Sequence, residues 1–342
     1  MLQKGRCYII AEIGGNFTDY GTAKLLIDQV AECGADAVKL QTYRADTISS
    51  KGTMFDQENT GVCAQYEYFK KFELSEELHK RVFDYAKEKG MDCFSTPSHY
   101  SDVEMLERLG AQVYKIGADD ATNFPLLEKI AKLNKPMILS TGMCTLEEVR
   151  EAVNVILRTG NRQLSVLHTV GNYPTSPEEV NLSVIQTFKR EFPNLTIGYS
   201  DHTLGVFSCI CAAVMGAEII EKHFTYDKNA DGPDHMLSAT KDELKFMVER
   251  IREFEIMRGT GLKLPVGSEI LDRTLSRKSL ITVKPIKKGE CFTESNIDIK
   301  RPGTGIRPQY IDRFLGCHAA RDLEIDQILA WSDLGWTDSQ DT

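Results

Sequence analysis

The amino-acid sequence predicts an α/β fold, in which a parallel barrel of eight βα units precedes a small, mostly β domain. Short β-branched runs alternate with amphipathic helical stretches, a pattern typical of parallel βα units. Eight such units fit within about 260 residues, the size of a TIM (β/α)8 barrel. After Gly259 the alternation ends, and the sequence breaks into short strands and turns. A doubly wound parallel sheet is the alternative fold for the first part.

The predicted strands occur in regular succession, and a helical pattern follows each of them. The first helix is expected over 21–33 and the last over 241–259. The eight strands are predicted at 7–14, 37–42, 92–97, 113–118, 136–141, 164–170, 196–201 and 219–225.

Two further segments complete the predicted organisation. The connection from Thr42 to Glu73 is long for a compact scaffold, and loops of this size are often functional lids. Part of it, around 66–71, is expected to be helical. We divide the chain into a barrel domain at 1–259, a Gly- and Pro-rich linker at 260–277 and a small β domain at 278–342.

The composition excludes several classes of protein. The formal charge is −9, from 41 Lys and Arg against 50 Asp and Glu, so no basic tract is offered to nucleic acid. No segment approaches 18 uninterrupted apolar residues, and we expect a cytoplasmic protein without membrane association. The nine cysteines are scattered without a CxxC pair, and we interpret them as reduced thiols.

Nearly every predicted strand ends in polar residues. Active sites of TIM barrels lie at the carboxyl ends of their strands, so this pattern favours a catalytic barrel. Helix N-capping explains part of the Ser and Thr residues but not the Lys, His and Glu residues. The polar strand ends are Glu12, Lys39, Gln41, Ser95, Thr96, Lys115, Ser140, Thr141, His168, Ser200, Asp201, His202, Glu221 and His223.

Two histidines are candidate metal ligands. His202 ends one predicted strand and His223 lies in the next, so one barrel mouth would hold both imidazoles, beside Asp201, Glu221 and Asp234. Two imidazoles with acidic oxygens and waters suit Mn²⁺ or a similar divalent ion better than a closed zinc site, which would use more thiolates. The alternative is a pair of hydrogen-bonded core histidines.

Three lysines lie in or at the ends of predicted strands, namely Lys39, Lys115 and Lys222. A buried lysine needs an anionic partner, so an acidic protein can still hold a small phosphorylated carboxylate there. Pairing within the protein, with Glu12 or Glu221, is the alternative. Hydroxyls at Thr96, Ser140 and Ser200 could bind the same anion. Neither GxGxxG nor GxxxxGK[ST] occurs, so nucleotide dependence is unsupported.

Ten short motifs resemble the sialic acid (N-acetylneuraminate) synthase family in order and spacing, over essentially the whole chain. The tail is similar to the antifreeze-like (SAF, β-clip) domain that follows the barrel in that family. The motifs are AEIGGN (11–16), KLQT (39–42), STP (95–97), KIGA (115–118), STGM (140–143), NYPT (172–175), YSDHT (199–203), EKHFT (221–225), GPDH (232–235) and KRPG (300–303).

The resemblance implies a phosphoenolpyruvate-dependent transferase. Such an enzyme condenses phosphoenolpyruvate with open-chain N-acetylmannosamine and water, which gives a nine-carbon 2-keto sugar acid and phosphate. The alternative acceptor is a 2,4-diacetamido-trideoxy hexose, leading to legionaminic or pseudaminic acid, or another sugar of a surface polysaccharide. A metal-dependent barrel hydrolase and a carbohydrate- or ice-binding tail on an inert barrel are the alternatives from other classes.

The resemblance also assigns roles. His202 and His223 would bind Mn²⁺ or Mg²⁺, with Glu12 near its water ligands and as base for the attacking water. Glu221 would manage protons near the aldehyde, and Arg301 would act across a domain-swapped homodimer. Phosphoenolpyruvate would contact Lys39, Thr96, Lys115, Ser140 and Ser200, and the substrates would also involve Gln41, Asn172, Tyr173, Lys222 and Asp234.

The sequence departs from the family pattern at three places. Ala118 stands where many relatives carry Ser, and Gly171 with Asn172 stands where relatives often have a polar residue two before the tyrosine. The 50–65 loop also lacks a match to the sugar-contacting segment of the N-acetylmannosamine enzymes. These departures concern the acceptor sugar more than the reaction.

Overall fold

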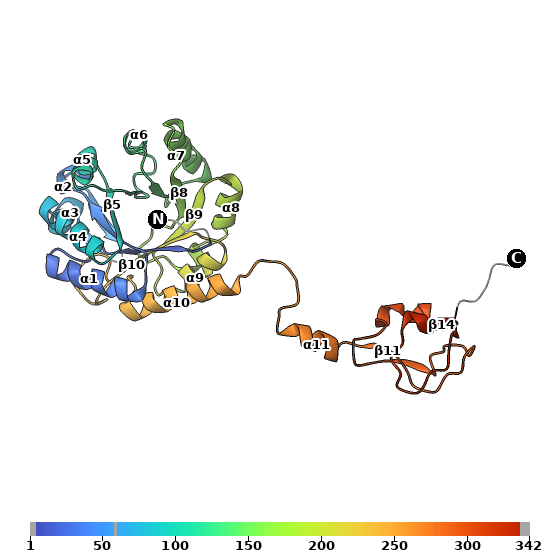
Figure 1. Cartoon of the computed structure of the whole chain (residues 1–342). Helices are drawn as coiled ribbons and strands as arrows, with labels where there is room; N and C mark the ends of the chain where they lie inside the picture. The colour runs from blue at the N-terminus through green and yellow to red at the C-terminus, as the bar shows by residue number, and fades with distance from the viewer. Residues whose placement is uncertain (1–4, 58–59, 336–342) are drawn as a thin grey trace. The chain divides into compact units, whose positions relative to one another are not determined.

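The computed structural model describes residues 5–57 and 60–335 (Figure 1). The chain divides into two compact units, Met1–Gly259 and Thr260–Thr342. Each unit has its own hydrophobic core, and each is described by itself below.

The first unit is a closed barrel of eight parallel strands, which confirms the predicted fold and excludes the doubly wound sheet. The strands pair in the order β1-β10-β9-β8-β7-β6-β5-β2 around the barrel. They are β1 (Tyr8–Glu12), β2 (Ala37–Thr42), β5 (Asp92–Pro97), β6 (Tyr114–Ile116), β7 (Met137–Ser140), β8 (Leu164–His168), β9 (Thr196–Asp201) and β10 (Ile219–His223).

A helix follows each strand of the barrel, and together these helices surround it (Figure 1). The principal core lies between the strands and this outer layer. The helices are α1 (Tyr20–Cys33), α4 (Glu76–Glu88), α5 (Tyr100–Arg108), α6 (Phe124–Ala131), α7 (Leu146–Arg158), α8 (Val184–Glu191), α9 (Phe207–Val214) and α10 (Lys241–Met257).

Local capping explains where several of these helices begin. Asp19 accepts a hydrogen bond from the Thr22 amide at the start of α1, and Gly34 ends the helix in the left-handed conformation. Helix α7 begins with a reciprocal capping box between Thr145 and Glu148. These contacts satisfy backbone groups that a helix end leaves without partners.

Side-chain alternation along the strands decides which residues enter the barrel. The interior is filled at one level by a small apolar cluster that includes Ile10, Ile138 and Ile219. Because successive side chains of a strand point to opposite faces, the residues two positions further along also point inward. In β1 and β10 those residues are Glu12 and Glu221, so a polar layer lies above the apolar plug at the carboxyl ends of the strands.

The long connection after β2 contains regular structure of its own. It forms α2 (Ala45–Ile48), an antiparallel hairpin of β3 (Met54–Gln57) and β4 (Gly61–Ala64), and α3 (Gln65–Phe72). Helix α3 confirms the helix expected around 66–71. The hairpin was not expected, because four-residue strands give little periodicity.

The second unit is built from short antiparallel pairs around a small core that includes Leu280, Phe292 and Phe314. Helix α11 lies within the segment predicted as a linker, at Glu269–Ser276. The remaining elements are β11 (Ser279–Thr282), β12 (Ile297–Lys300), β13 (His318–Ala319), β14 (Leu334–Gly335) and 3₁₀ turns at Pro308–Arg313 and Trp331–Asp333, with a further 3₁₀ turn of the barrel unit at Pro177–Glu179.

Within residues 5–57 and 60–335, no helix combines the length and the apolar character needed to cross a membrane.

Candidate active site

A cavity of about 540 Å³ opens at the carboxyl ends of the barrel strands. It brings together most of the candidate residues from the sequence, on β2, β5, β6, β7, β9 and β10 and in the loops that follow β8, β9 and β10. The candidates that line it are Lys39, Gln41, Thr96, Lys115, Ser140, Tyr173, Ser200, His202, Glu221, His223 and Asp234.

Lys39, Lys115 and Glu221 form the floor of the cavity, and Glu12 pairs with Lys39 but does not itself line the cavity. Lys39 makes an ion pair with Glu12 on the neighbouring strand β1, and its Nζ lies 3.8 Å from Glu221 Oε1. Lys115 Nζ lies 3.6 Å from the same oxygen of Glu221. All four side chains are buried. The protein therefore provides anionic partners for both lysines. Pairing with Glu12 or Glu221 was the alternative to anion binding that the sequence left open.

Hydroxyl groups complete this floor. Lys39 Nζ donates to Thr96 Oγ1 at 3.1 Å, and Lys115 Nζ donates to Ser140 Oγ at 2.6 Å. Ser200 Oγ donates to Glu221 Oε1 at 3.2 Å. Ammonium and hydroxyl donors from five different strands thus converge, which is the donor set that an oxyanion such as a phosphate or carboxylate requires.

Burial and charge shift the pKa values of this cluster. Burial raises the pKa of Glu12, and Lys39 opposes this effect only in part. Burial alone would raise the pKa of Glu221, but Lys115 and Lys39 outweigh burial and lower it. The two carboxyl groups therefore differ in proton affinity although they share one lysine, and such pairs are frequent at catalytic sites.

The two candidate histidines lie side by side above the floor. Their ring centroids are 5.4 Å apart, and the Tyr173 ring stacks on His202 with a centroid distance of 4.0 Å. Burial lowers the pKa of His202 to about 4 and that of His223 well below its usual range. Both rings are therefore neutral at pH 7, and each can present a nitrogen lone pair.

Hydrogen bonds fix the orientation of these rings. His202 Nδ1 lies 2.6 Å from the Val170 carbonyl oxygen, so this nitrogen donates and Nε2 carries the lone pair. His223 Nδ1 is 3.4 Å from Asp234 Oδ2 and makes no hydrogen bond within the described part of the chain. Burial, followed by repulsion from Glu12, raises the pKa of Asp234 to about 7, which Lys39 and a hydrogen bond from Gln41 oppose.

Two glycines let the backbone approach this cluster closely. A Cβ atom at Gly14 would lie 2.7 Å from the Gln41 backbone nitrogen, closer than side chains pack. Gly15 has a φ of +78°, and a Cβ there would lie 3.0 Å from Asp234 Oδ2. The Gly-Gly pair after β1 is thus required by space and by backbone conformation.

Sequence reasoning missed several residues that line the cavity. Asp119 and Thr169 follow strand ends but were not selected, although their positions after β6 and β8 could have suggested them. Four aromatic residues come from the connection after β2, in which the sequence predicted a helix but no site residue. These four, which we call the aromatic wall, are Tyr43, Phe55, Tyr68 and Phe69.

Lys222 does not line the cavity, which corrects its assignment as a substrate-binding residue. It lies between Glu221 and His223, so strand alternation points it to the opposite face, toward the helices. There its Nζ makes a fully buried ion pair with Asp201 at 2.7 Å. Asp201 also accepts hydrogen bonds from Tyr199 and Ser208, which shows that this pair supports the barrel wall.

Asn172 lies outside the cavity lining as well. Asn172 is exposed, and its side-chain nitrogen donates to Glu179 Oε2 at 3.1 Å, so its assignment as a substrate ligand within the barrel unit is corrected. Arg301 directly follows β12 in the second unit and is exposed.

We expect Lys222→Met to lower the free energy of unfolding by about 3–5 kcal/mol, because it leaves the buried Asp201 charge unpaired. Urea denaturation monitored by circular dichroism would measure the change. As a matched control, Lys80→Met removes an exposed pair with Asp84 and should leave the free energy of unfolding unchanged within error. If Lys222→Met lowered the free energy of unfolding by less than about 1 kcal/mol, the assignment of Lys222 to a structural buried ion pair would be contradicted.

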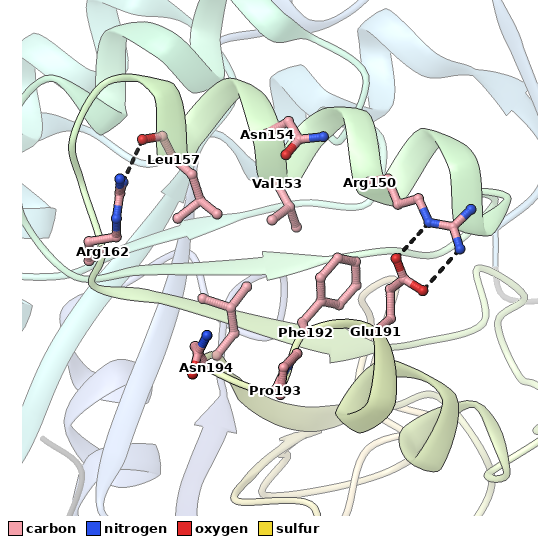
Figure 2. A pocket seen from close by; sticks show the side chains of 10 residues that line it. Arg150, Val153, Asn154, Leu157, Arg162, Glu191, Phe192, Pro193 and Asn194 are labelled. Carbon is pink, nitrogen blue, oxygen red and sulfur yellow. Dashed lines mark hydrogen bonds and ion pairs between the residues drawn. The ribbon is translucent and has the colours of Figure 1, made fainter.

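A second hollow, of about 530 Å³, lies on the outside of the barrel between α7 and the segment that precedes β9 (Figure 2). Its charged groups are already paired. Arg150 binds Glu191 through two hydrogen bonds of 2.7 and 2.9 Å, and Arg162 donates to the Leu157 carbonyl. Neither a histidine nor a buried charged side chain lines this hollow.

Comparisons with known proteins give two family matches and several similar sequences. Residues 26–263 match the model of the NeuB family, and residues 277–335 match that of the SAF domain. The chain is 40% identical to the N,N'-diacetyllegionaminic acid synthase of Campylobacter jejuni, over 94% of this chain and 98% of the relative. It is 39% identical to the enzyme of the same name from Legionella pneumophila, over 96% and 94%.

A solved structure supports the same relationship. The N-acetylneuraminic acid (sialic acid) synthetase of Leptospira borgpetersenii, in complex with citrate, superposes with a TM-score of 0.71 at 31% identity. The superposition covers 78% of this chain and 90% of that chain.

Proposed function

The chain belongs to the NeuB family, with a C-terminal SAF domain, and we propose that it condenses phosphoenolpyruvate with the open-chain aldehyde of a 2-acetamido sugar. It is an enzyme of the phosphoenolpyruvate-dependent, carbon–carbon bond-forming transferase class. Water is the third reactant, and the products are phosphate and a nine-carbon 2-keto sugar acid.

One observation carries the proposal: two buried lysines and three hydroxyls line the same cavity as two neutral imidazoles. Phosphoenolpyruvate carries a phosphate and a carboxylate that repel each other. Lys39 and Lys115 would neutralise one group each, while Thr96, Ser140 and Ser200 donate to the remaining oxygens. Ion pairs of this kind gain more in a partly closed site than in water.

The two glutamates have distinct proposed tasks. Carbon 3 of the enol attacks the aldehyde carbon, and the aldehyde oxygen takes a proton that Glu221 would relay from water. Water then adds to the cation at carbon 2, and Glu12 would accept the proton that this water loses. The tetrahedral product expels phosphate and leaves the 2-keto group. Glu221 retains a buried Oε2 without a hydrogen bond in the described part of the chain. Glu12 Oε2 pairs with Lys39.

The residues present fit a divalent metal ion. His202 and His223 offer neutral nitrogens, and His223 Nδ1 is buried without a hydrogen bond from any described residue. In residues 5–57 and 60–335, no group of three or more His, Cys, Asp or Glu side chains is arranged to bind a metal ion. Waters or substrate oxygens would therefore supply the remaining ligands. Asp234 and Glu12 would hold those waters. Mn²⁺, Mg²⁺ or another divalent cation bound there would act as a Lewis acid on a carbonyl oxygen.

Two acceptor sugars suit this reaction. The sequence resemblance favours N-acetylmannosamine, which would make the product N-acetylneuraminate. The names of the two relatives at 39–40% identity favour a 2,4-diacetamido-trideoxy hexose, which would lead to a diacetylated acid. Gln41, Tyr173 and Asp234 lie beside the imidazoles and would contact either sugar.

The second unit would contribute a residue to the site of another subunit. We propose that Arg301, exposed after β12, reaches the acceptor sugar in a domain-swapped homodimer. Its charged side chain is exposed in the second unit, as contact with a ligand requires.

Phosphate release from phosphoenolpyruvate tests the reaction directly. The full-length protein should release phosphate only when Mn²⁺ and an acceptor aldehyde are both present, and a chelator should abolish the release. The panel should contain N-acetylmannosamine and a 2,4-diacetamido-trideoxy hexose, with N-acetylglucosamine as a negative control. No release with any acceptor in the presence of Mn²⁺ would exclude the proposed function.

A further inference from the structure

The segment between β10 and α10 carries Asp234, and backbone hydrogen bonds close it into a loop. We call residues 224–239 the β10 loop. The Thr225 amide donates to the Ala239 carbonyl at 3.0 Å, and the Ala239 amide donates to the His223 carbonyl at 2.7 Å. Both ends of the loop therefore lie at the carboxyl end of β10, and Asp234 lines the cavity from within the loop.

Asn16 binds both ends of this loop. It is the last residue of the AEIGGN motif after β1, and it is buried. Its Nδ2 donates to the Phe224 carbonyl at 2.8 Å and to Ser238 Oγ at 2.9 Å. Because a carbonyl oxygen only accepts hydrogen bonds, the amide nitrogen must be the atom that faces Phe224. One buried side chain thus joins the segment after β1 to the β10 loop.

Ser238 connects this contact to Asp234. Its hydroxyl accepts from Asn16 and donates to the Asp234 carbonyl oxygen at 2.6 Å, and the Ser238 amide donates to the same oxygen at 3.1 Å. The residue before Asn16 approaches Asp234 as well, since a Cβ atom at Gly15 would lie 3.0 Å from Asp234 Oδ2. The backbone and the carboxyl group of Asp234 are therefore both placed by the segment after β1.

An outer contact of the loop is weaker than this inner one. Lys71 pairs with Asp231 at 2.8 Å, but the Asp231 side chain is 87% exposed. Exposed ion pairs are screened by water and contribute little to stability. Removal of the Asn16 amide would instead leave the Phe224 carbonyl without this buried donor, and an unpaired buried polar group is costly. Asn16 is thus the stronger anchor of the two.

From these contacts we propose that Asn16 is a positioning residue, which anchors the β10 loop so that the Asp234 carboxyl group stands beside the imidazoles. The inference rests on the proposed function, in which Asp234 would hold metal-bound waters and contact the acceptor sugar. Asn16 does not itself line the cavity, so it acts through Asp234. Asp234 Oδ2 lies 3.4 Å from His223 Nδ1, and a displacement of about 1 Å can cost about 10²-fold in rate.

Hydrogen exchange of the full-length protein, without metal or substrate, tests the anchor independently of turnover. In Asn16→Ala, peptides from the β10 loop should exchange at least about tenfold faster than in the wild type, because the loop opens more often. Peptides from β5 and β6 should exchange at the wild-type rate. Ser238→Ala should have a smaller effect in the same peptides, because Asn16 keeps its bond to the Phe224 carbonyl.

Steady-state phosphate release separates positioning from a general loss of folded protein. With the acceptor that supports release by the wild type, Asn16→Ala should raise KM for the acceptor about 10- to 100-fold. KM for phosphoenolpyruvate should stay within about twofold, because Lys39, Lys115 and Ser140 lie on other strands. A smaller fraction of folded enzyme would lower the apparent kcat and change neither KM.

Asn161→Ala is the matched control. Asn161 is as buried as Asn16, and its Nδ2 likewise donates to a backbone carbonyl, that of Lys135, at 2.8 Å. It precedes β8, at the opposite end of the barrel strands from the cavity. Asn161→Ala should leave both KM values and the exchange of the β10 loop unchanged.

Three outcomes are decisive. Wild-type exchange of the β10 loop in folded Asn16→Ala would overturn the inference, as would an equal rise of KM for both substrates. A wild-type protein that released no phosphate with any acceptor would exclude the proposed function, and with it the role of Asn16 in catalysis. Faster exchange confined to the β10 loop would then still support Asn16 as its anchor, so the two failures are distinguishable.

Discussion

Replacing Lys39 with methionine is expected to lower kcat/KM for phosphoenolpyruvate by about 10³-fold. The substitution removes a buried cation from the anion-binding floor and leaves Glu12 without its ion-pair partner. Truncating one member of a buried, hydrogen-bonded charge pair costs about 2–5 kcal/mol, and 10³-fold corresponds to about 4 kcal/mol. Steady-state phosphate release at saturating acceptor would measure the loss.

An exposed lysine supplies the control for this variant. Lys132 on the barrel surface pairs with Glu128 and does not line the cavity, so Lys132→Met should leave kcat/KM unchanged. A loss below tenfold in a folded Lys39→Met protein would contradict the role of Lys39 in binding phosphoenolpyruvate.

The same variant tests the proposed exchange of Arg301 between subunits. Co-expression of Lys39→Met with Arg301→Ala would give mixed dimers in which one site keeps both native residues. Activity should then return to about a quarter of the wild-type value, by random pairing of subunits in a twofold dimer. If Arg301 acted within its own chain, each site would lack one residue and no activity would return.

Replacing both imidazoles, in His202→Ala/His223→Ala, is expected to abolish Mn²⁺ binding and to lower turnover by at least about 10³-fold, as for loss of a principal electrostatic contributor. The two rings are the neutral nitrogen donors that meet in the cavity. Isothermal titration with Mn²⁺ measures binding independently of turnover, and circular dichroism reports the fold.

His168→Asn is the matched control for the histidines. His168 also ends a barrel strand, β8, and is buried, but it bonds to the Val180 carbonyl and does not line the cavity. Its replacement should leave Mn²⁺ affinity unchanged. Retention of wild-type affinity by the double alanine variant would place the metal elsewhere.

Much of the site could be predicted from the sequence because the barrel imposes a simple rule. Strand periodicity located β2, β5 and β9 with the observed bounds, and barrel geometry places strand ends at one mouth. Lys39, Lys115, Glu221 and His223 were found by this rule. The decisive signal was that charged or polar side chains occur in buried strands, where burying them without a partner costs free energy.

The errors at Lys222 and Asn172 have different causes. Lys222 was grouped with the other strand lysines, although the two-residue alternation between Glu221 and His223 already points it away from the cavity. Asn172 follows a strand end, but its loop turns the side chain outward to Glu179, which no local pattern encodes. The sequence thus shows which side chains of a strand face the barrel interior, but it does not show where a loop side chain points.

The sequence by itself determined the eight βα units, the polar layer at their carboxyl ends and the resemblance that specifies the reaction. These features follow from local periodicity and short motifs, which neighbouring residues fix. Only the tertiary structure decided that Lys39 and Lys115 share Glu221, and that four aromatic residues from the connection after β2 close the outer end of the cavity. Such contacts join residues that lie far apart in the chain, so barrel closure and side-chain packing select them rather than local propensity.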